Sequence, residues 1–309
     1  MNEQVERWAR EELSALGVTV RDVVWERIRP WSRVAKITTA GDPVWLKVNL
    51  GDTVYETGLL RLLGTLTPVH VVVPIAVDAA QGWSLSPHGG PTLRESHPDF
   101  DARLWERLLA EYAELQRELA PHVRDLLAVG VPDVTPERLP AHLSALLELP
   151  VVTEHLDIPR VRQEQRSFIE ECTELAASPI GPTLQHDDLH DNNVFAYHDR
   201  FAFFDWGDSV VSHPFGTLLV TLRVAAAKAE VKAGDPLLER LRSAYLEPWT
   251  GEHDRADLDR WAYLAMRVTK VSRALSYQRA LSAADEAGWA EWGEGIYGWL
   301  EELVGPDVW

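Results

Sequence analysis

Cysteine, methionine and lysine are scarce in this chain of 309 residues. It holds one cysteine, two methionines and five lysines, the lysines being a small share of 30 basic residues. The lone Cys172 excludes an internal disulfide framework and favours a reducing compartment such as the cytoplasm. Since Cys172 falls in a helical stretch, we expect it to be a core residue.

Long apolar runs and basic stripes are also missing. No stretch approaches the roughly 18 uninterrupted apolar residues of a membrane-spanning helix. The charged N-terminal segment lacks the basic start and apolar run of a signal peptide. The formal net charge of −18 argues against nucleic acid and anionic membranes as partners. Such acidity fits either a cationic substrate or a need for solubility. The sequence does not determine the oligomeric state.

The first part of the chain is rich in strand-like segments. An amphipathic helix over 1–16 precedes them, a helix over 53–63 interrupts them, and the turn-forming run 87–91 ends the pattern. The remainder has helical periodicity, broken by one polar loop with flanking strands. Strands are predicted at 18–29, 34–39, 44–48, 69–77 and 83–86, and helices at 100–119, 136–149, 159–177, 214–230, 236–246, 255–281 and 289–304.

The chain exceeds the size at which one hydrophobic core stops growing, so we expect two lobes. The predicted fold is α+β: a small antiparallel sheet with one packed helix in residues 1–87, and a larger, mainly helical lobe in residues 88–309. Ligand sites commonly lie between such lobes.

The polar loop carries the chemistry. It reads His-x-Asp-x-x-x-x-Asn from His186 to Asn193, and a further carboxylate, Asp205, follows the next apolar strand. This spacing suits phosphoryl transfer, with Asp188 facing an acceptor hydroxyl while Asn193 and Asp205 hold Mg²⁺ on nucleotide phosphates. His186 is expected to brace the loop by hydrogen bonding. The alternative is a surface turn, since turns are rich in Asp and Asn.

Lys47 stands out because it is one of few lysines and lies inside an apolar strand. Glu56, nine residues later on the predicted helix, could pair with it and aim the ammonium at nucleotide phosphates. The alternative is a lysine at a strand edge whose ammonium reaches water, beside an unrelated glutamate. No glycine-rich phosphate loop occurs. Ser32 and Arg33, in a predicted turn, are either phosphate contacts or part of a solvated turn.

In this order, these motifs resemble the aminoglycoside phosphotransferase and choline kinase group of small-molecule kinases, relatives of protein kinases. His190, two residues after Asp188, is similar to that group's H-x-D-L-H-x-x-N, and Asp205-Trp206 replaces Asp-Phe-Gly. The resemblance implies ATP and Mg²⁺ as cofactors and a small hydroxylated acceptor. It also implies an adenine-binding hinge over 83–89, with Ser86 and His88 as the contacts.

Departures from the group's pattern concern the acceptor side. Asp187 replaces a usual glycine, and Asp208 follows as a further acidic contact or a strand-end cap. Asp187 and Asp191 either bind an ammonium of the acceptor or are solvated. Residues 245–309 hold twelve acidic and six basic residues, which line an acceptor pocket or form solvated helix faces. Arg267, Arg273 and Tyr277 share a predicted helix face but have no assigned role.

The sequence therefore predicts an ATP-dependent phosphotransferase acting on a hydroxyl of a small molecule, with cationic aminoglycosides, amino sugars and amino alcohols as candidate acceptors. One alternative is a metal-dependent phosphohydrolase, since clustered His and Asp also build two-metal sites. Another is a non-catalytic, nucleotide-binding pseudokinase. The phosphohydrolase leaves Lys47 and Glu56 without a role, and the presence of all the key residues argues against a pseudokinase.

Overall fold

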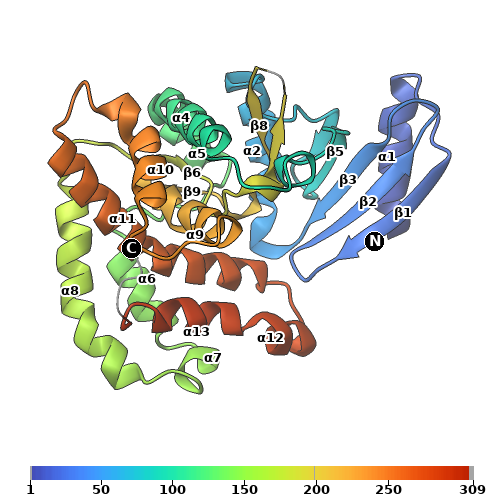
Figure 1. The fold of residues 1–309 in the computed structure, drawn as a ribbon. Coiled ribbons are helices and arrows are strands. Elements are labelled where there is room, and N and C mark those ends of the chain that lie inside the picture. Colours follow the sequence, from blue (N-terminus) through green and yellow to red (C-terminus); the bar gives the residue numbers. More distant parts are fainter. Residues whose placement is uncertain (1, 198, 306–309) are drawn as a thin grey trace.

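The computed structural model describes residues 2–197 and 199–305. A twisted antiparallel sheet and a helical body lie side by side, with the polar loop between them (Figure 1). The sheet has the strand order β1-β2-β3-β5-β4. Its strands are β1 (Asp22–Ile28), β2 (Ser32–Thr38), β3 (Val44–Asn49), β4 (Ala76–Asp78) and β5 (Trp83–Pro87).

One face of this sheet packs against α1 (Asn2–Ala15). Side chains alternate along a strand, so Ala35 and Leu46 are buried toward Val5 and Leu13 of α1, whereas Lys47 lies on the opposite face. The second helix, α2 (Tyr55–Leu66), belongs instead to the larger core through Leu59 and its neighbours. The two helices therefore leave the Lys47 face of the sheet directed at the helical body.

The helical body is organised around α11 (Arg255–Ala280), a 26-residue helix that runs beneath the loop (Figure 1). Cys172, 1% exposed, lies in the body's hydrophobic core as expected. The other helices are α3 (Leu93–Ser96), α4 (Ala102–Leu119), α5 (Val123–Ala128), α6 (Leu139–Leu146), α7 (Pro150–Thr153), α8 (Ile158–Ala176), α9 (Leu218–Lys228), α10 (Pro236–Leu246), α12 (Glu286–Trp292) and α13 (Glu294–Glu301).

Two predicted elements differ from the structure. The segment 69–77 is not one strand: Val71 forms a single bridge with Phe203, and pairing with β5 begins only at Ala76. The helix expected over 289–304 is interrupted at Gly293, where a Cβ would lie 2.6 Å from the Trp289 carbonyl oxygen. Glycine avoids this contact because it has no Cβ, and it stands between α12 and α13. No helix within the described residues is long and apolar enough to cross a membrane.

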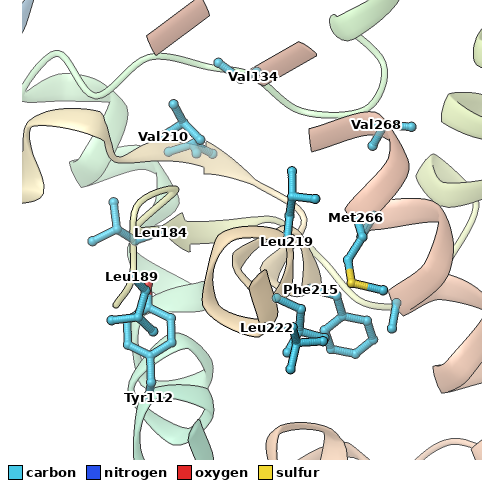
Figure 2. Packing of buried hydrophobic residues seen from close by; sticks show 14 of the residues in the cluster. Tyr112, Val134, Leu184, Leu189, Val210, Phe215, Leu219, Leu222, Met266 and Val268 are labelled. Carbon is cyan, nitrogen blue, oxygen red and sulfur yellow. The ribbon is translucent and has the colours of Figure 1, made fainter. Parts of the chain in front are cut away.

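The loop that carries the predicted chemistry is anchored in the core by Leu189. This side chain is fully buried and packs with Leu184 and Tyr112 (Figure 2). The Thr221 hydroxyl of α9 donates to the Leu189 carbonyl at 2.9 Å, and the His186 amide donates to the Tyr112 hydroxyl at 3.0 Å. Burial of Leu189 thus fixes the positions of the polar residues on either side of it in the loop. The short strands around the loop are β6 (Thr183–Gln185), β7 (Val194–Ala196), β8 (Phe201–Phe203) and β9 (Val210–Ser212).

Candidate active site

Lys47 reaches across the space between the sheet and the helical body. Its Nζ lies 2.7 Å from Glu56 Oε2 and 2.6 Å from Asp205 Oδ1. Burial alone would lower the pKa of Lys47, but the charges of Asp205 and Glu56 outweigh it and raise that pKa. The ammonium is therefore a fixed positive charge, held by α2 on one side and by the segment after β8 on the other.

Asp205 is held in an unusual backbone conformation. Its φ of 61° lies in the left-handed region, which is uncommon for a residue other than glycine. Tyr55 of α2 stabilises the turn that follows, because its hydroxyl lies within hydrogen-bond distance of the Gly207 and Ser209 carbonyl oxygens, at 2.6 and 2.8 Å, and its one proton is shared between them. The charge of Lys47 holds the pKa of Asp205 below its usual value. The Asp205 side chain is still 41% exposed, so one carboxylate oxygen remains accessible to a ligand.

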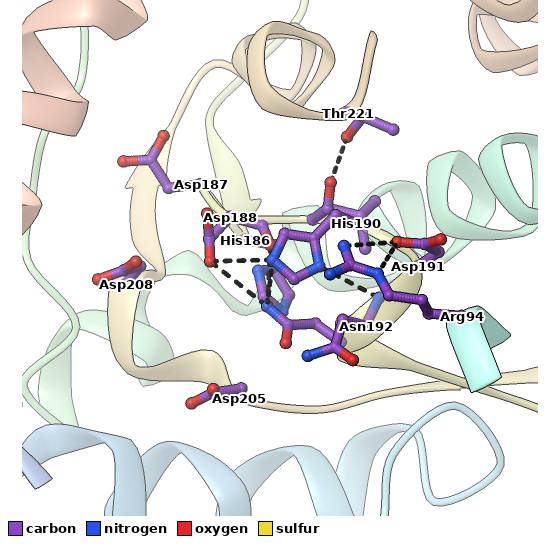
Figure 3. Close-up of polar contacts among 12 residues, drawn as sticks. Arg94, His186, Asp187, Asp188, His190, Asp191, Asn192, Asp205, Asp208 and Thr221 are labelled. Atoms are coloured by element: carbon purple, nitrogen blue, oxygen red, sulfur yellow. Dashed lines mark hydrogen bonds and ion pairs between the residues drawn. The ribbon is translucent and has the colours of Figure 1, made fainter. Parts of the chain in front are cut away.

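Asp188 lies on the same side of the loop as Asp205 (Figure 3). Its Oδ2 is 3.5 Å from His190 Nε2 and 3.4 Å from Asn193 Nδ2, while its Oδ1 is 3.3 Å from Nη2 of Arg273. Burial opposes ionisation of Asp188, but Arg273 and His190 favour the anion and hold the pKa below its ordinary value. Asp188 is therefore an oriented carboxylate at neutral pH.

His186 occupies the bracing position that its place in the motif predicts. The ring is fully buried, and its Nε2 lies 3.0 Å from the Phe204 carbonyl oxygen, one residue before Asp205. Burial lowers the pKa of His186, so the neutral ring donates this bond. The contact joins the start of the loop to the segment that presents Asp205.

Two acidic loop residues turn inward. Asp187, with φ of 65°, is 1% exposed and accepts hydrogen bonds from Gln185 Nε2 at 2.6 Å and Ser272 Oγ at 2.7 Å. Asp191 is completely buried, and Arg94 Nη2 lies 2.8 Å from its Oδ1 (Figure 3). On the other side, Lys228 Nζ lies 2.7 Å from its Oδ2. Neither of the two open alternatives for these residues holds. They are not solvated, and they are too enclosed to bind an acceptor ammonium.

Arg273 of α11 is the main site residue that the sequence left without a role. It is 5% exposed, and its Nη1 donates to the Asp187 carbonyl at 2.9 Å and to Asp208 Oδ2 at 3.1 Å. Asp208 is thus an ion-pair partner of Arg273 in addition to Asp188. The only sequence signal was that Arg273 and Tyr277 share a helix face. Arg267, on the same helix, pairs with Glu171 at 2.9 Å.

Ser32 and Arg33, the two candidate phosphate contacts, lie on opposite faces of the sheet. Ser32 lies on the Lys47 face of β2 and lines a cavity with Lys47. Arg33 lies on the α1 face, where its Nη1 donates to Asn2 Oδ1 at 2.9 Å. A strand turns successive side chains to opposite faces, so the two neighbours could not both face the nucleotide. Arg27 of β1 lines this cavity, because a register shift between Trp25 and Arg27 places it on the Lys47 face.

Two adjoining cavities meet at Lys47, Glu56 and Asp205. The first has about 380 Å³ and is lined by both predicted hinge residues, Ser86 and His88, and by Asn193. The Trp45 indole donates to His88 Nδ1 at 3.2 Å. This cavity brings the predicted hinge residues, Lys47 and both predicted metal ligands into one continuous space.

The second cavity, of about 230 Å³, contains Asp188 and Asp208. Its C-terminal wall comes from α11 and α12. Of the two alternatives for the acidic residues after position 245, lining of this cavity does not hold: within the described chain, the lining residues after that position are Arg273, Ser276, Tyr277, Ala280 and Trp292. The acidic excess of the C-terminal helices lies elsewhere.

A lysine–glutamate pair at the sheet and a loop carboxylate at the helical body define a small-molecule kinase with a protein-kinase-like fold. The chain belongs to the phosphotransferase enzyme family, whose profile matches residues 4–264. No match was found among curated proteins.

Solved structures share this fold over nearly the whole chain. The GDP complex of wild-type aminoglycoside 2′-phosphotransferase-IIIa is 15% identical, with a TM-score of 0.60 over 96% of this chain and 99% of that one. A choline/ethanolamine kinase family protein from Mesorhizobium loti is 16% identical, with a TM-score of 0.60 over 98% and 96%. Amicoumacin kinase hAmiN, in complex with AMP-PNP, Ca²⁺ and Ami, is 14% identical, with a TM-score of 0.59 over 99% and 98%.

Proposed function

We propose that this kinase transfers the γ-phosphoryl group of ATP to a hydroxyl of a small molecule. The observation that carries the proposal is the Lys47 ammonium, which bridges Glu56 at 2.7 Å and Asp205 at 2.6 Å where the two cavities join. In this arrangement Lys47 binds nucleotide phosphates in the larger cavity, and Asp188 faces an acceptor in the smaller one.

The larger cavity suits a nucleotide. Ser86, near the end of β5, and His88, directly after it, line this cavity, and we assign them to the adenine. Ser32 and Arg27 line the same cavity and are assigned to the phosphates. Arg27 forms no ion pair among residues 2–197 and 199–305, and its charge acts on Asp205 from a distance, so we assign its guanidinium to the transferring phosphoryl group.

The donor set fits Mg²⁺. Asn193 donates through Nδ2 to the Asp188 carbonyl at 3.0 Å, which leaves its amide oxygen for a metal, and Asp205 retains an exposed carboxylate oxygen. Hard oxygen donors of this kind, together with phosphate oxygens and water, are what Mg²⁺ prefers. When bound, the ion would neutralise phosphate charge. We assign Asn193 and Asp205 as the residues that hold it.

Asp188 orients the acceptor. Its carboxylate accepts the hydrogen bond of the attacking hydroxyl and takes its proton as the new oxygen–phosphorus bond forms and the bond to the ADP oxygen breaks. His190 and Arg273 hold the carboxylate in place at 3.5 and 3.3 Å. We further propose residues 1–87 and 88–309 as the two lobes, and the cytoplasm, where ATP is supplied, as the location.

The test combines binding and turnover. ATP and GTP are titrated with and without Mg²⁺ while the melting temperature is followed, and ADP release is then measured against a panel of hydroxylated acceptors. The proposal predicts Mg²⁺-dependent stabilisation by ATP and acceptor-dependent ADP release that wild type shows and Asp188→Ala loses. Hydrolysis of phosphate esters with transition metals, without any need for ATP, would support the phosphohydrolase instead. Nucleotide binding without turnover would support a pseudokinase.

A further inference from the structure

The smaller cavity carries information about the acceptor, and this inference rests on the proposed function. Its two carboxylates on the acceptor side, Asp188 and Asp208, are both within ion-pair distance of the Arg273 guanidinium, at 3.3 and 3.1 Å. Arg27 adds a further positive charge to the lining. Glu56 and Asp205 also line the cavity and pair with Lys47, so the lining carries four carboxylates and three cations, and each carboxylate has a cationic partner. An ammonium group entering here would have to compete with Arg273 or Lys47 for a carboxylate, which is less favourable for a cationic ligand than meeting an unpaired one.

Three aromatic side chains line part of this cavity. Trp31, in the turn between β1 and β2, packs edge-to-face against Trp292 of α12, with ring centroids 5.1 Å apart. Tyr277 of α11 also lines the cavity. These rings offer flat apolar surfaces on which the C–H face of a small ring compound can pack, while its hydroxyls face the polar wall.

The polar wall holds hydrogen-bond groups that the protein leaves unused. Asn49 is 2% exposed and lines the cavity, and its Nδ2 has no hydrogen-bond partner in the described chain. Within residues 2–197 and 199–305, the Tyr277 hydroxyl likewise has none. A buried amide without a partner is costly, so a ligand hydroxyl that accepts from Asn49 gains from satisfying it.

The cavity is also small. Its volume of about 230 Å³ lies below the roughly 300–1,000 Å³ of pockets for drug-sized ligands. This size admits one ring with its hydroxyl groups rather than several linked rings. The volume, the paired carboxylates and the aromatic side chains of this cavity therefore all favour a small, uncharged ring compound.

We propose that the acceptor is an uncharged single-ring polyol, a monosaccharide or a cyclitol, stacked on Trp31 and Trp292 and bound through Asn49 and Tyr277. Aminoglycosides, with several rings and several ammonium groups, do not fit the charge or the volume of this cavity. Compact amines such as choline fit the volume, but they would find only carboxylates that already pair with Arg273 or Lys47.

Matched acceptors test this on the intact enzyme with MgATP. Glucose is compared with glucosamine, and myo-inositol with 2-deoxystreptamine; choline and kanamycin represent cationic acceptors. We expect ADP release with at least one uncharged ring, confirmed as a phosphorylated product by mass spectrometry, and a kcat/KM at least about tenfold above that of its amine counterpart. Equal or better turnover of the amines, of choline or of kanamycin overturns the inference.

Two variants test whether Asn49 and Tyr277 contact the acceptor. Asn49→Leu and Tyr277→Phe should each raise KM for the ring acceptor and leave KM for MgATP unchanged, whereas no change in the acceptor KM for either variant overturns the assigned contacts. If MgATP binds but no uncharged ring is phosphorylated, the inference fails and the kinase assignment stands. If MgATP does not bind, the proposed function itself fails.

Discussion

Asp187→Asn should stabilise the protein at neutral pH, although it removes a charge next to the proposed catalytic residue. Burial raises the pKa of Asp187 from 3.8 to about 6, despite the opposing charge of Arg273. That difference corresponds to about 3 kcal/mol of unfolding free energy. Asparagine also tolerates the left-handed φ of 65° at this position.

The direction of the pH dependence follows from which state loses its proton first. Below pH 3.8 the carboxyl is protonated in both the folded and the unfolded chain. As pH rises toward 6, the unfolded chain ionises first, so the wild type loses the stability that the protonated form contributed. Above about pH 6, the stability contributed by the protonated carboxyl is fully lost and no longer changes with pH. An asparagine has no proton to lose here, so the stability of the variant relative to wild type should rise through the same pH range.

The gain in unfolding free energy that we expect for Asp187→Asn at pH 8 is smaller than the value of about 3 kcal/mol that corresponds to the full pKa difference. Asparagine forfeits the attraction of Arg273, but its amide can donate to Gln185 Oε1, a buried oxygen that has no partner in the described residues. We expect a net gain of about 1–2 kcal/mol at pH 8. The difference between variant and wild type should grow by up to about 3 kcal/mol from pH 4 to pH 8.

The assay is urea denaturation of wild type and variant across this pH range. Asp191→Asn is the matched control, because Asp191 lies in the same loop and is also fully buried. Burial opposes its ionisation, but Arg94 and Lys228 outweigh burial and lower the pKa of Asp191. Its ionised form stabilises the fold above the unfolded pKa, so the control should lose stability at neutral pH and recover relative to wild type as pH falls. A pH-independent difference for Asp187→Asn would refute the reasoning.

Three further predictions concern catalysis. Asp188→Ala should lower kcat by about 100- to 10,000-fold with little change in ATP affinity, measured by ADP release and nucleotide titration; turnover equal to wild type would remove the assigned role. Asp205→Ala should weaken MgATP binding by at least about tenfold in calorimetry, because a metal ligand and a partner of Lys47 are both lost, and unchanged affinity would contradict this. Arg27→Met should lower kcat by about 100-fold while the protein stays folded, and Arg33→Met, on the other face, is its control.

The sequence determined the chemistry that depends on local spacing. His186, Asp188 and Asn193 lie within eight positions of one loop, so their order alone indicates which side chains share a site. The alternation of β3 likewise places Lys47 on the face opposite the residues that bury against α1. Local periodicity was also enough to predict a sheet followed by a helical body.

Only the tertiary structure decided the surroundings of these residues. Arg273 is 85 positions from Asp188, and nothing in its local sequence distinguishes it from the other arginines of the chain. Arg27 faces the site because of a register shift, and Arg33 does not because of strand alternation. Asp187 and Asp191 look like solvated loop residues until their buried partners are in place. Spacing along a chain fixes which groups are neighbours in one segment, whereas burial and pairing depend on segments that meet only when the chain folds.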